Sequence, residues 1–368
     1  MHVRALISTG IVAATTVGAA ACAGDGRQPS PEAARATIAA PRLERPQLLM
    51  WRGTQLVRRG ADGRSAQVLV GGSGGEGLEA TPTERAAWSP DGRRLALTAR
   101  AAGMSDVDTD FYVVRADGSR PRRLTSDGIS SHPVWSPDRR RIYFAREPKR
   151  HPAAIILSDG SREVPAWIWS MRPDGSDHRA ITAPVEGRYE VPESFSPDGA
   201  TLAFTRGTYV ELDEHGREHN TRGVWLMRPD GTHRHKLAER SHDPVFAPDG
   251  RRIAFASDRD QNGSLSYGDK AFFANELYVM DADGARPRRL TRTGVLNEQQ
   301  PSWLPSGTRI AYQRGKQFQN AQFTTVMQAN RDGGCARPIL TGRPRGPWYA
   351  APAWRPGDAR NGDQALRC

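Results

Sequence analysis

The chain has 368 residues and a formal net charge of +11, from 52 Lys and Arg against 41 Asp and Glu. The 37 Gly and 27 Pro recur every few positions, which excludes the uninterrupted helices of a bundle or a helix-rich enzyme. Only one segment is long and apolar, so a polytopic membrane protein is also excluded. The basic residues form no run interleaved with aromatic residues, and we predict no nucleic-acid partner.

Residues 1–21 have the pattern of an export signal. Arg4 forms a short positive region, an apolar stretch of small residues follows, and Ala21 is followed directly by Cys22. This placement resembles the bacterial lipoprotein signal, in which the Cys becomes the lipidated first residue, although Ala19 stands where that signal usually has Leu. We therefore predict an extracytoplasmic, membrane-anchored lipoprotein with its lipid on Cys22. An ordinary signal peptide cut at another Ala is the alternative.

The segment that begins with Cys22 is predicted to be a tether. Residues 22–46 are rich in Ala, Pro, Gly, Arg and Ser and show no periodic apolar pattern. The two remaining cysteines, Cys335 and Cys368, make an even pair in an oxidising compartment. We predict a disulfide between them that fixes the C-terminal tail, residues 358–368; two free thiols are the alternative.

One short motif recurs six times along the body of the chain. An aromatic residue is followed by Ser-Pro-Asp-Gly or a variant of it, and an alternating apolar stretch comes after the first five copies. A second Asp-Gly turn and a short Arg-Leu-Thr-like segment complete most units, as in Asp117-Gly118 and Leu124-Thr125. Asp-Gly between alternating runs is a strong hairpin signal, so each unit is predicted to hold about four short antiparallel strands. The motif copies begin at Trp88, Trp135, Phe195, Phe246, Trp303 and Trp354.

The two ends of this repeat region complement each other. The last copy supplies one innermost strand at Trp354, and three apolar N-terminal stretches near Trp51, Val57 and Leu69 supply the rest of a sixth unit. A blade shared in this way closes a ring of sheets and removes an exposed sheet edge. We therefore predict an all-β fold over residues 47–357. It is a six-bladed propeller of four-stranded antiparallel blades, closed by N-terminal strands that pair with a C-terminal strand.

These repeated motifs resemble the TolB-like, or WD40-like (PD40), β-propeller family. The resemblance covers residues 47–356 and implies the six-bladed fold and a role in envelope integrity or transport. Residues 23–46 are too few for the family's N-terminal α/β domain, which we do not expect here. Propellers host binding modules and enzymes alike, so the resemblance leaves the activity open.

Two groups of residues could carry chemistry, and the first is a possible calcium loop. Its oxygen-bearing side chains follow the spacing of a calcium-binding loop, with Gly263 at the sixth position. A plain hairpin turn, common in the family at this place, is the alternative, so calcium is the one cofactor considered. The candidate ligands are Asp258, Asp260, Asn262, Ser264, Ser266 and Asp269.

The second group consists of polar residues predicted just before each innermost strand, where they would face one mouth of the central channel. They could bind a ligand or a peptide terminus, or hold a metal through His132, Glu190, His242 and Asp243. A hydrated channel lining without a function is the alternative. The residues of this group are Glu84, Arg85, Ser131, His132, Glu190, His242, Asp243, Gln299, Gln300 and Tyr349.

We predict a monomeric, non-enzymatic, lipid-anchored propeller that binds another envelope protein or a glycan. The inserts at 101–110, 146–164, 209–222, 262–273 and 316–324 would carry specificity. The alternatives are a metal-dependent lyase or hydrolase that acts on carbohydrate at the channel mouth, and a sensor whose ligand occupies the channel.

Overall fold

The computed structural model places all the described strands in one compact unit, Leu43–Cys368. No described helix is long and apolar enough to cross a membrane. The predicted signal, Cys22 and the tether lie outside the described residues. Those residues are 47–52, 55–60, 66–71, 78–80, 86–101, 110–126, 130–147, 155–156, 162–163, 165–208, 221–267, 270–294, 296–315, 324–341, 349–356 and 366–368.

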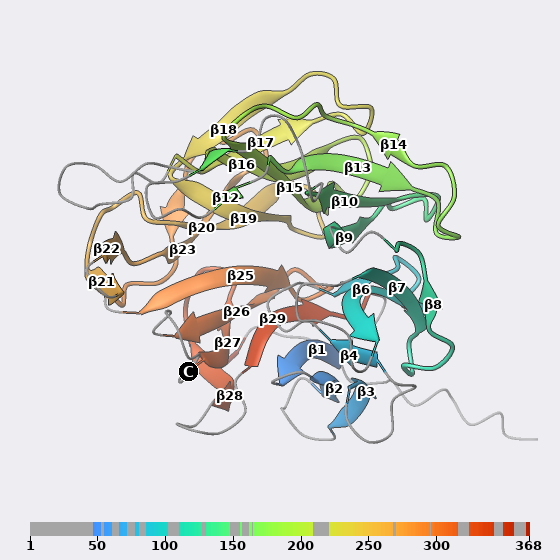
Figure 1. Cartoon of the computed structure of the whole chain (residues 1–368). Helices are drawn as coiled ribbons and strands as arrows, with labels where there is room; N and C mark the ends of the chain where they lie inside the picture. The colour runs from blue at the N-terminus through green and yellow to red at the C-terminus, as the bar shows by residue number, and fades with distance from the viewer. Residues whose placement is uncertain are drawn as a thin grey trace, which may run out of the picture. The chain divides into compact units, whose positions relative to one another are not determined.

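Six antiparallel sheets form the blades of a propeller, and the fold prediction is confirmed. Figure 1 shows them around a common centre, with β9, β15, β19, β25 and β29 nearest to it. From the centre outward, blade 1 comprises β29 (Tyr349–Trp354), β1 (Gln47–Arg52), β2 (Gln55–Gly60) and β3 (Gln67–Val70). Blade 2 comprises β4 (Leu78–Ala80) with β5 (Ala87–Trp88), then β6 (Arg94–Ala101), β7 (Asp110–Arg115) and β8 (Arg122–Arg123). Blade 3 comprises β9 (Ser130–Trp135), β10 (Ile142–Arg146), β13 (Trp167–Met171) and β14 (Arg179–Ala180).

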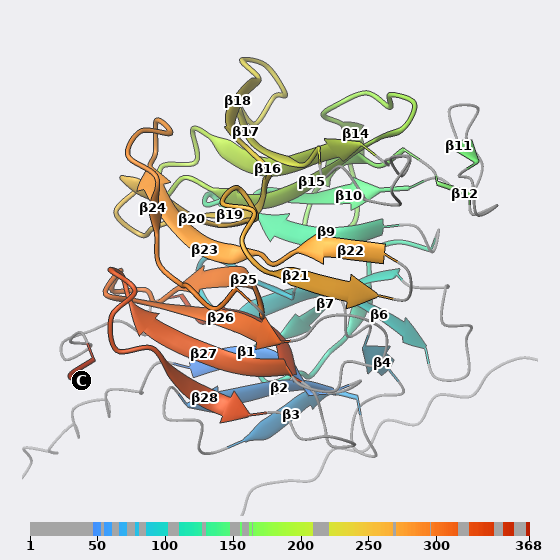
Figure 2. The ribbon, with the colours of Figure 1, turned by 90° about the vertical axis from the view of Figure 1, so that its left-hand side faces the viewer.

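Blades 4 to 6 have the same order of strands, and each has one continuous innermost strand, whereas that of blade 2 is divided into β4 and β5. Two small hairpins, β11 (Ile155–Ile156) with β12 (Arg162–Glu163) and β21 (Ser264–Tyr267) with β22 (Lys270–Phe273), lie beside the blades (Figure 2). Blade 4 comprises β15 (Arg188–Phe195), β16 (Leu202–Thr208), β17 (Gly223–Met227) and β18 (His235–Glu239). Blade 5 comprises β19 (Ser241–Phe246), β20 (Arg252–Ser257), β23 (Glu276–Asp281) and β24 (Arg288–Arg289). Blade 6 comprises β25 (Asn297–Trp303), β26 (Arg309–Gly315), β27 (Thr324–Asn330) and β28 (Arg337–Thr341).

The ring closes in blade 1, as the sequence predicts. Strand β29 from the C-terminal part pairs with β1 from the N-terminal part, with Leu48 opposite Trp354 and Leu49 opposite Ala353. The backbone N–H of Arg355 donates to the carbonyl of Gln47 at 2.9 Å and extends this pairing. Strand β1 is therefore paired on both sides, by β2 and β29, and β29 takes the innermost place of its blade.

Apolar side chains fill the spaces between neighbouring blades. Leu95 and Leu97 of β6 pack toward blade 1, whereas Ala96 between them packs toward blade 3. This is the two-residue period of a strand whose two faces are both buried. Leu48 and Met50 of β1 pack with Leu304 and Val326 of blade 6, so the seam between the last and first blades is filled like the others.

The recurring Ser-Pro-Asp-Gly motif forms the turn between the first two strands of a blade. In blade 2 the hydroxyl of Ser89 donates to Asp91 at 2.7 Å and accepts the backbone N–H of Arg94 at 2.9 Å. Gly92 has a φ of 64°, which glycine adopts at little cost. The same bonds recur in blade 4, where the hydroxyl of Ser196 and the N–H of Ala200 hold the pKa of Asp198 below its ordinary value.

The Arg-Leu-Thr segments bind within their own blade and to the next one. The hydroxyl of Thr125 accepts the backbone N–H of Phe111 at 3.0 Å, and Thr291 accepts that of Leu277 at 2.9 Å, again 14 residues away. In blades 2 to 6 the glycine of the second Asp-Gly turn lies against a Leu or Ile in or next to the outer strand of the preceding blade. A Cβ added to Gly118 would lie 2.1 Å from the carbonyl oxygen of Leu69, so only glycine fits.

Candidate functional site

The two ends of the propeller differ in the segments that they carry. The Ser-Pro-Asp-Gly and Asp-Gly turns lie at one end, called the turn end here, because each joins neighbouring antiparallel strands there. The innermost strands begin at the opposite end, called the loop end. At the loop end β6 finishes at Ala101 and β7 begins at Asp110, so the inserts 101–110 and 146–164, predicted to carry specificity, start from this end.

The predicted mouth residues lie inside the innermost strands. Ser131 and His132 belong to β9, Glu190 to β15, His242 and Asp243 to β19, and Gln299 and Gln300 to β25. The prediction that they precede these strands was therefore wrong by a few residues, because the strands extend further toward the loop end. Arg85 and Glu84 lie outside the described residues, as does the side chain of Tyr349, the first residue of β29.

Three of these polar residues lie at irregularities of their strands. His132, Asp243 and Gln300 have φ values of 56°, 56° and 53°, and each precedes a proline. The pairing with the second strand of the blade shifts register at each of these points. A bulge of this kind redirects a side chain, and a left-handed backbone at a non-glycine residue costs about 1–2 kcal/mol. The same strained backbone therefore occurs at equivalent positions of the innermost strands of blades 3, 5 and 6.

A hydrogen-bond network joins blades 4, 5 and 6 at this depth. Asp243 accepts the backbone N–H of Gln300 at 2.8 Å, and its own N–H donates to the hydroxyl of Thr205 at 3.2 Å. Nδ1 of His242 lies 3.3 Å from Oδ2 of Asp243, and its Nε2 lies 3.2 Å from the side-chain oxygen of Asn275. His242 and Asp243 of the mouth are thus held in place by contacts within blade 5 and with blades 4 and 6.

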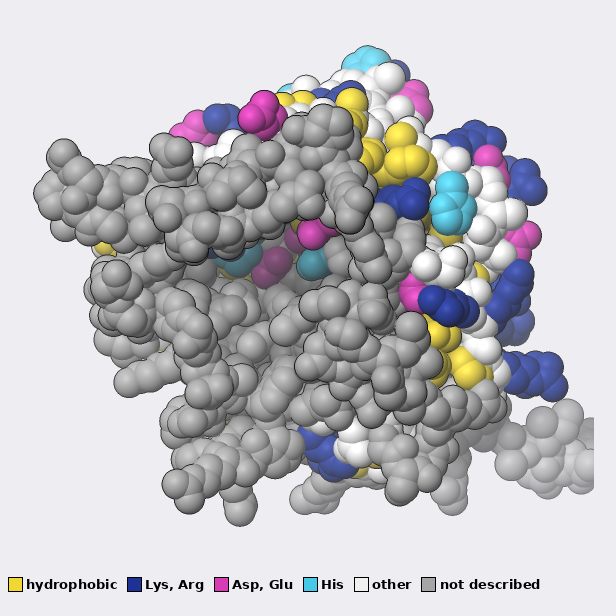
Figure 3. Space-filling model, viewed as in Figure 1, with side chains coloured by type: hydrophobic (Ala, Val, Ile, Leu, Met, Phe, Trp, Pro, Cys, Tyr) yellow, Lys and Arg dark blue, Asp and Glu magenta, His cyan; other side chains and the backbone are white. Residues whose placement is uncertain are grey.

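Figure 3 shows the loop end hollowed at its centre, with acidic and histidine side chains at the bottom of the hollow. Of the predicted mouth residues, His132, Glu190, His242 and Asp243 are of these kinds, and they belong to the innermost strands of blades 3, 4 and 5. The predicted group therefore comes together from three blades around one opening.

Glu190 is buried and paired with arginine. It accepts from Nε of Arg206 at 2.8 Å, and the guanidinium of Arg206 stacks on Trp225 at 3.9 Å from the ring centroid. Glu298 lies at the equivalent position of β25, five residues before the aromatic residue of the motif, and accepts from Nε of Arg314 at 2.7 Å. The sequence analysis missed Glu298, although this shared spacing from Phe195 and Trp303 would have revealed it.

Glu298 shares a buried site with a second carboxylate, Glu276 of β23. Burial, together with the nearby Glu276, raises the pKa of Glu298 to about 8. Glu276 accepts from Arg289 at 2.8 Å and from the backbone N–H of Thr293 at 2.7 Å. At neutral pH Glu298 is therefore mostly protonated.

The candidate calcium loop has guanidinium partners. Asp258 accepts from Arg240 at 3.0 Å, Asp260 forms an ion pair with Arg289, and the side-chain amide of Asn262 lies against the same arginine. The segment continues into the hairpin of β21 and β22, which contains Ser264 and Ser266, and Asp269 lies outside the described residues. Within the described ranges, no group of three or more His, Cys, Asp or Glu could hold a metal ion. Calcium binding here stays a prediction.

The turn end of the channel has a different character. A cavity of about 440 Å³ opens there, with lining residues from all six innermost strands. Trp88, Trp135, Phe195 and Trp354 and several prolines form most of its wall. His132 and Glu193 also line this cavity, which therefore extends from the depth of the polar mouth residues to the mostly apolar turn end.

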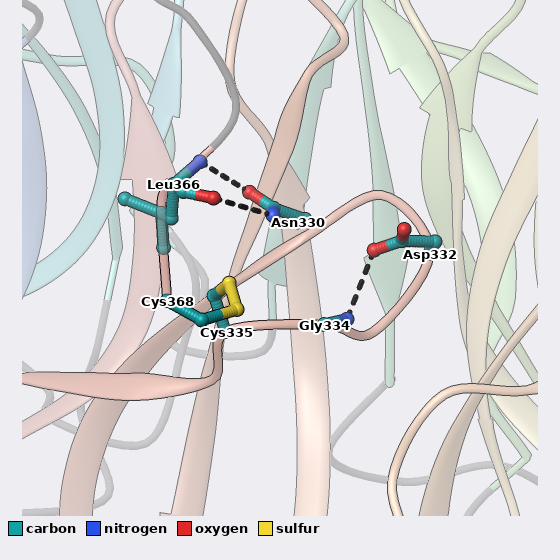
Figure 4. The surroundings of a disulfide bond; sticks show 6 residues. All are labelled: Asn330, Asp332, Gly334, Cys335, Leu366 and Cys368. Carbon is teal, nitrogen blue, oxygen red and sulfur yellow. Dashed lines mark hydrogen bonds between the residues drawn. A yellow bond between two sulfur atoms is a disulfide. The ribbon is translucent and has the colours of Figure 1, made fainter.

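The predicted disulfide joins Cys335 to Cys368, whose Cα atoms lie 5.1 Å apart. Figure 4 shows how it holds the C-terminal residues beside blade 6, where the backbone N–H of Leu366 donates to the side chain of Asn330 at 2.6 Å. The side-chain N–H of Asn330 returns a bond to the carbonyl of Leu366 at 3.0 Å. A covalent bond and two hydrogen bonds therefore fix residues 366–368.

Residues 76–267, just over half of the chain, match the profile of the TolB beta propeller domain family (PD40). The chain belongs to this family. The matched range covers blades 2 to 4 and the first two strands of blade 5, with four of the six motif copies.

Two solved members of the TolB group have a similar fold. TolB from Acinetobacter baumannii superposes with a TM-score of 0.60 at 16% sequence identity, over 84% of this chain and 67% of that one. The putative TolB from Agrobacterium tumefaciens gives 0.55 at 18% identity, over 83% of this chain and 91% of that one. Identities this low show the shared fold alone.

One curated relative, the uncharacterized peptidase YuxL of Bacillus subtilis (strain 168), is 34% identical over 125 residues. The matched stretch is 32% of this chain but 16% of that protein. The chain therefore spans less than a fifth of this relative's length.

Proposed function

We propose that this TolB-like propeller is a non-enzymatic binding scaffold of the cell envelope, and that a protein or glycan partner binds at the loop-end mouth. One observation carries the proposal. Polar side chains from the innermost strands of blades 3 to 6 converge on one hollow, and three of them lie in left-handed bulges at equivalent depth.

The contacts of this mouth favour binding over metal-assisted catalysis. The carboxylate of Glu190 pairs with Arg206, and that of Asp243 accepts the N–H of Gln300. A metal held by His132, Glu190, His242 and Asp243 would have to displace these bonds. A rigid rim of donors and acceptors, with specificity added by inserts, is typical of a recognition surface.

The proposed location is extracytoplasmic, with a lipid anchor on Cys22. The export-signal pattern of residues 1–21 and the Cys335–Cys368 disulfide support it, because structural disulfides persist in oxidising compartments. The family membership is consistent with this location.

Site-specific photocrosslinking in intact cells tests the proposal. A photoreactive side chain replaces Gln299 at the mouth, and a control variant carries it at Ala200, which is exposed at the turn end. We expect a discrete crosslinked product from position 299 that is missing from position 200. No product at position 299, or the same product from both, would contradict mouth binding.

A metal and turnover assay tests the enzymatic alternative on the same protein. Stoichiometric metal in the purified chain, with turnover of a glycan panel that is lost in His242→Ala, would replace the scaffold by an enzyme. We expect neither in the wild-type chain.

A further inference from the structure

Arginine dominates the turn end of blades 2 and 3. In blade 2 five exposed arginines are accompanied there by two aspartates, Asp91 and Asp117. The arginines are Arg93, Arg94, Arg115, Arg120 and Arg122. In blade 3 Arg139 and Arg140 follow Asp138 in the first turn. We call the six residues Arg93, Arg94, Arg115, Arg120, Arg139 and Arg140 the arginine face.

The two blades form one continuous surface. Arg139 of blade 3 lies 3.1 Å from the carboxylate of Asp91 in blade 2, and Arg122 of blade 2 donates to the carbonyl of Asp174 in blade 3 at 2.8 Å.

The aspartates of this surface accept hydrogen bonds within their own turns, and Asp91 also pairs with Arg139 of blade 3. Asp117 accepts the hydroxyl of Ser119 at 2.7 Å, and Asp91 accepts that of Ser89. The guanidinium groups of Arg93, Arg94, Arg115 and Arg120, in contrast, make no hydrogen bond or ion pair within the described part of the chain. Several arginines are therefore available to an external anion.

The N-terminal segment joins the propeller next to this face. Strand β1 begins at Gln47 at the turn end, and Arg355, which pairs with Gln47, also donates to the carbonyl of Gly92 at 3.1 Å. Gly92 directly precedes Arg93. Gln47, the first described residue, therefore lies at the edge of the arginine face.

We propose that the arginine face binds the anionic phospholipid surface of the membrane that anchors the protein. Each Lys or Arg close to such a surface contributes about 1 kcal/mol, and stable anchoring generally needs a second signal beside a single lipid chain. Contact through the turn end directs the loop-end mouth away from the membrane, toward its partner. The orientation depends on the lipid anchor of the proposed function, whereas the anionic contact does not.

Vesicle cosedimentation of the full-length Cys22→Ser chain tests this contact without a lipid anchor. The probes are vesicles of phosphatidylcholine alone and of phosphatidylcholine with 30% phosphatidylglycerol. We expect binding only to the anionic vesicles and its loss as salt is raised, because screening weakens exposed charge interactions. Equal binding to both kinds of vesicle, or none to either, would overturn the proposal.

Two matched variants locate the contact. Replacing Arg93, Arg94, Arg115 and Arg120 by Gln is expected to lower the partition constant for anionic vesicles at least tenfold. The same four-charge change at the exposed residues Arg228, Arg251, Arg286 and Arg331, on the turn end of blades 4 to 6, is expected to lower it less than threefold. Equal losses would mean non-specific attraction by net charge and would overturn the assignment to this face.

A soluble polyanion distinguishes a lipid surface from an acidic polymer. Dextran sulfate is titrated against the Cys22→Ser chain and its arginine-face variant, and thermal melts confirm that both are folded. Binding of dextran sulfate that depends on the face, without binding to anionic vesicles, would assign the face to a polymer and contradict the membrane proposal.

Discussion

At the residue scale, the repeated motif residues are explained by contacts between blades. The second Asp-Gly turn of a blade lies against the outer-strand Leu or Ile of the preceding blade: Gly118 against Leu69, and Gly231 against Ile181. The sequence shows that these residues recur, but it does not show that glycine and leucine of successive units touch. That contact becomes visible only when successive blades are packed side by side, because it joins residues about 50 positions apart.

Substitution of two glycines separates steric contact from backbone strain. Both Gly118 and Gly199 have positive φ, of 85° and 75°. A Cβ on Gly118 would lie 2.1 Å from the carbonyl oxygen of Leu69, whereas one on Gly199 would lie 3.7 Å from Pro137. We expect Gly199→Ala to lower the free energy of unfolding by about 1 kcal/mol and Gly118→Ala by at least about 3 kcal/mol. Denaturant unfolding measures both, and equal losses would contradict the close blade contact.

At the element scale, a strand from each of two blades brings two buried carboxyl groups together. Glu276 begins β23 of blade 5, and Glu298 lies near the start of β25 of blade 6. Thr293 links them, because its backbone N–H donates to Glu276 and its hydroxyl donates to Glu298 at 3.0 Å. The stability of this blade interface should therefore depend on pH.

Glu298→Gln tests that dependence. In the unfolded chain the pKa of a Glu is about 4.3, whereas in the folded chain that of Glu298 is raised to about 8. Between these values the folded state retains a proton that the unfolded state releases, so this group lowers the free energy of unfolding as pH rises. We expect the variant to gain about 2–5 kcal/mol over wild type between pH 5 and pH 8 in urea unfolding.

Glu239→Gln is the control, since Glu239 is exposed at the end of β18. Its stability curve should run nearly parallel to that of wild type over this range. A parallel curve for Glu298→Gln would mean that Glu298 is ionised in the folded protein at neutral pH.

The strands could be predicted from the sequence, whereas the bulges within them could not. His132, Asp243 and Gln300 were identified as mouth residues, but their bulges depend on how each strand pairs with its neighbour. The calcium-like spacing of Asp258 and Asp260 could not be interpreted from sequence, because their partners Arg240 and Arg289 come from other segments.

At the scale of the whole molecule, six motif copies were enough to predict the closed ring. The cause is physical: each sheet has two apolar faces, and only a ring buries both faces of all of them. The fold also places the polar mouth at the loop end and the arginine face at the opposite, turn end, as the two proposed contacts require. Which segments lie at the turn end and which at the loop end follows from the strand order in the blades, and the spacing of the motif does not give that order.

Hydrogen–deuterium exchange of the full-length protein, followed by mass spectrometry, tests this closure most directly. Peptides from β1 and β29 are compared with a peptide from β15, whose pairing does not depend on the chain ends. In a closed ring the amides of β1 and β29 should exchange as slowly as those of β15, because they open only with the whole propeller. Exchange of the β29 amides within seconds, while β15 stays protected, would contradict the closed ring and with it the two opposed ends.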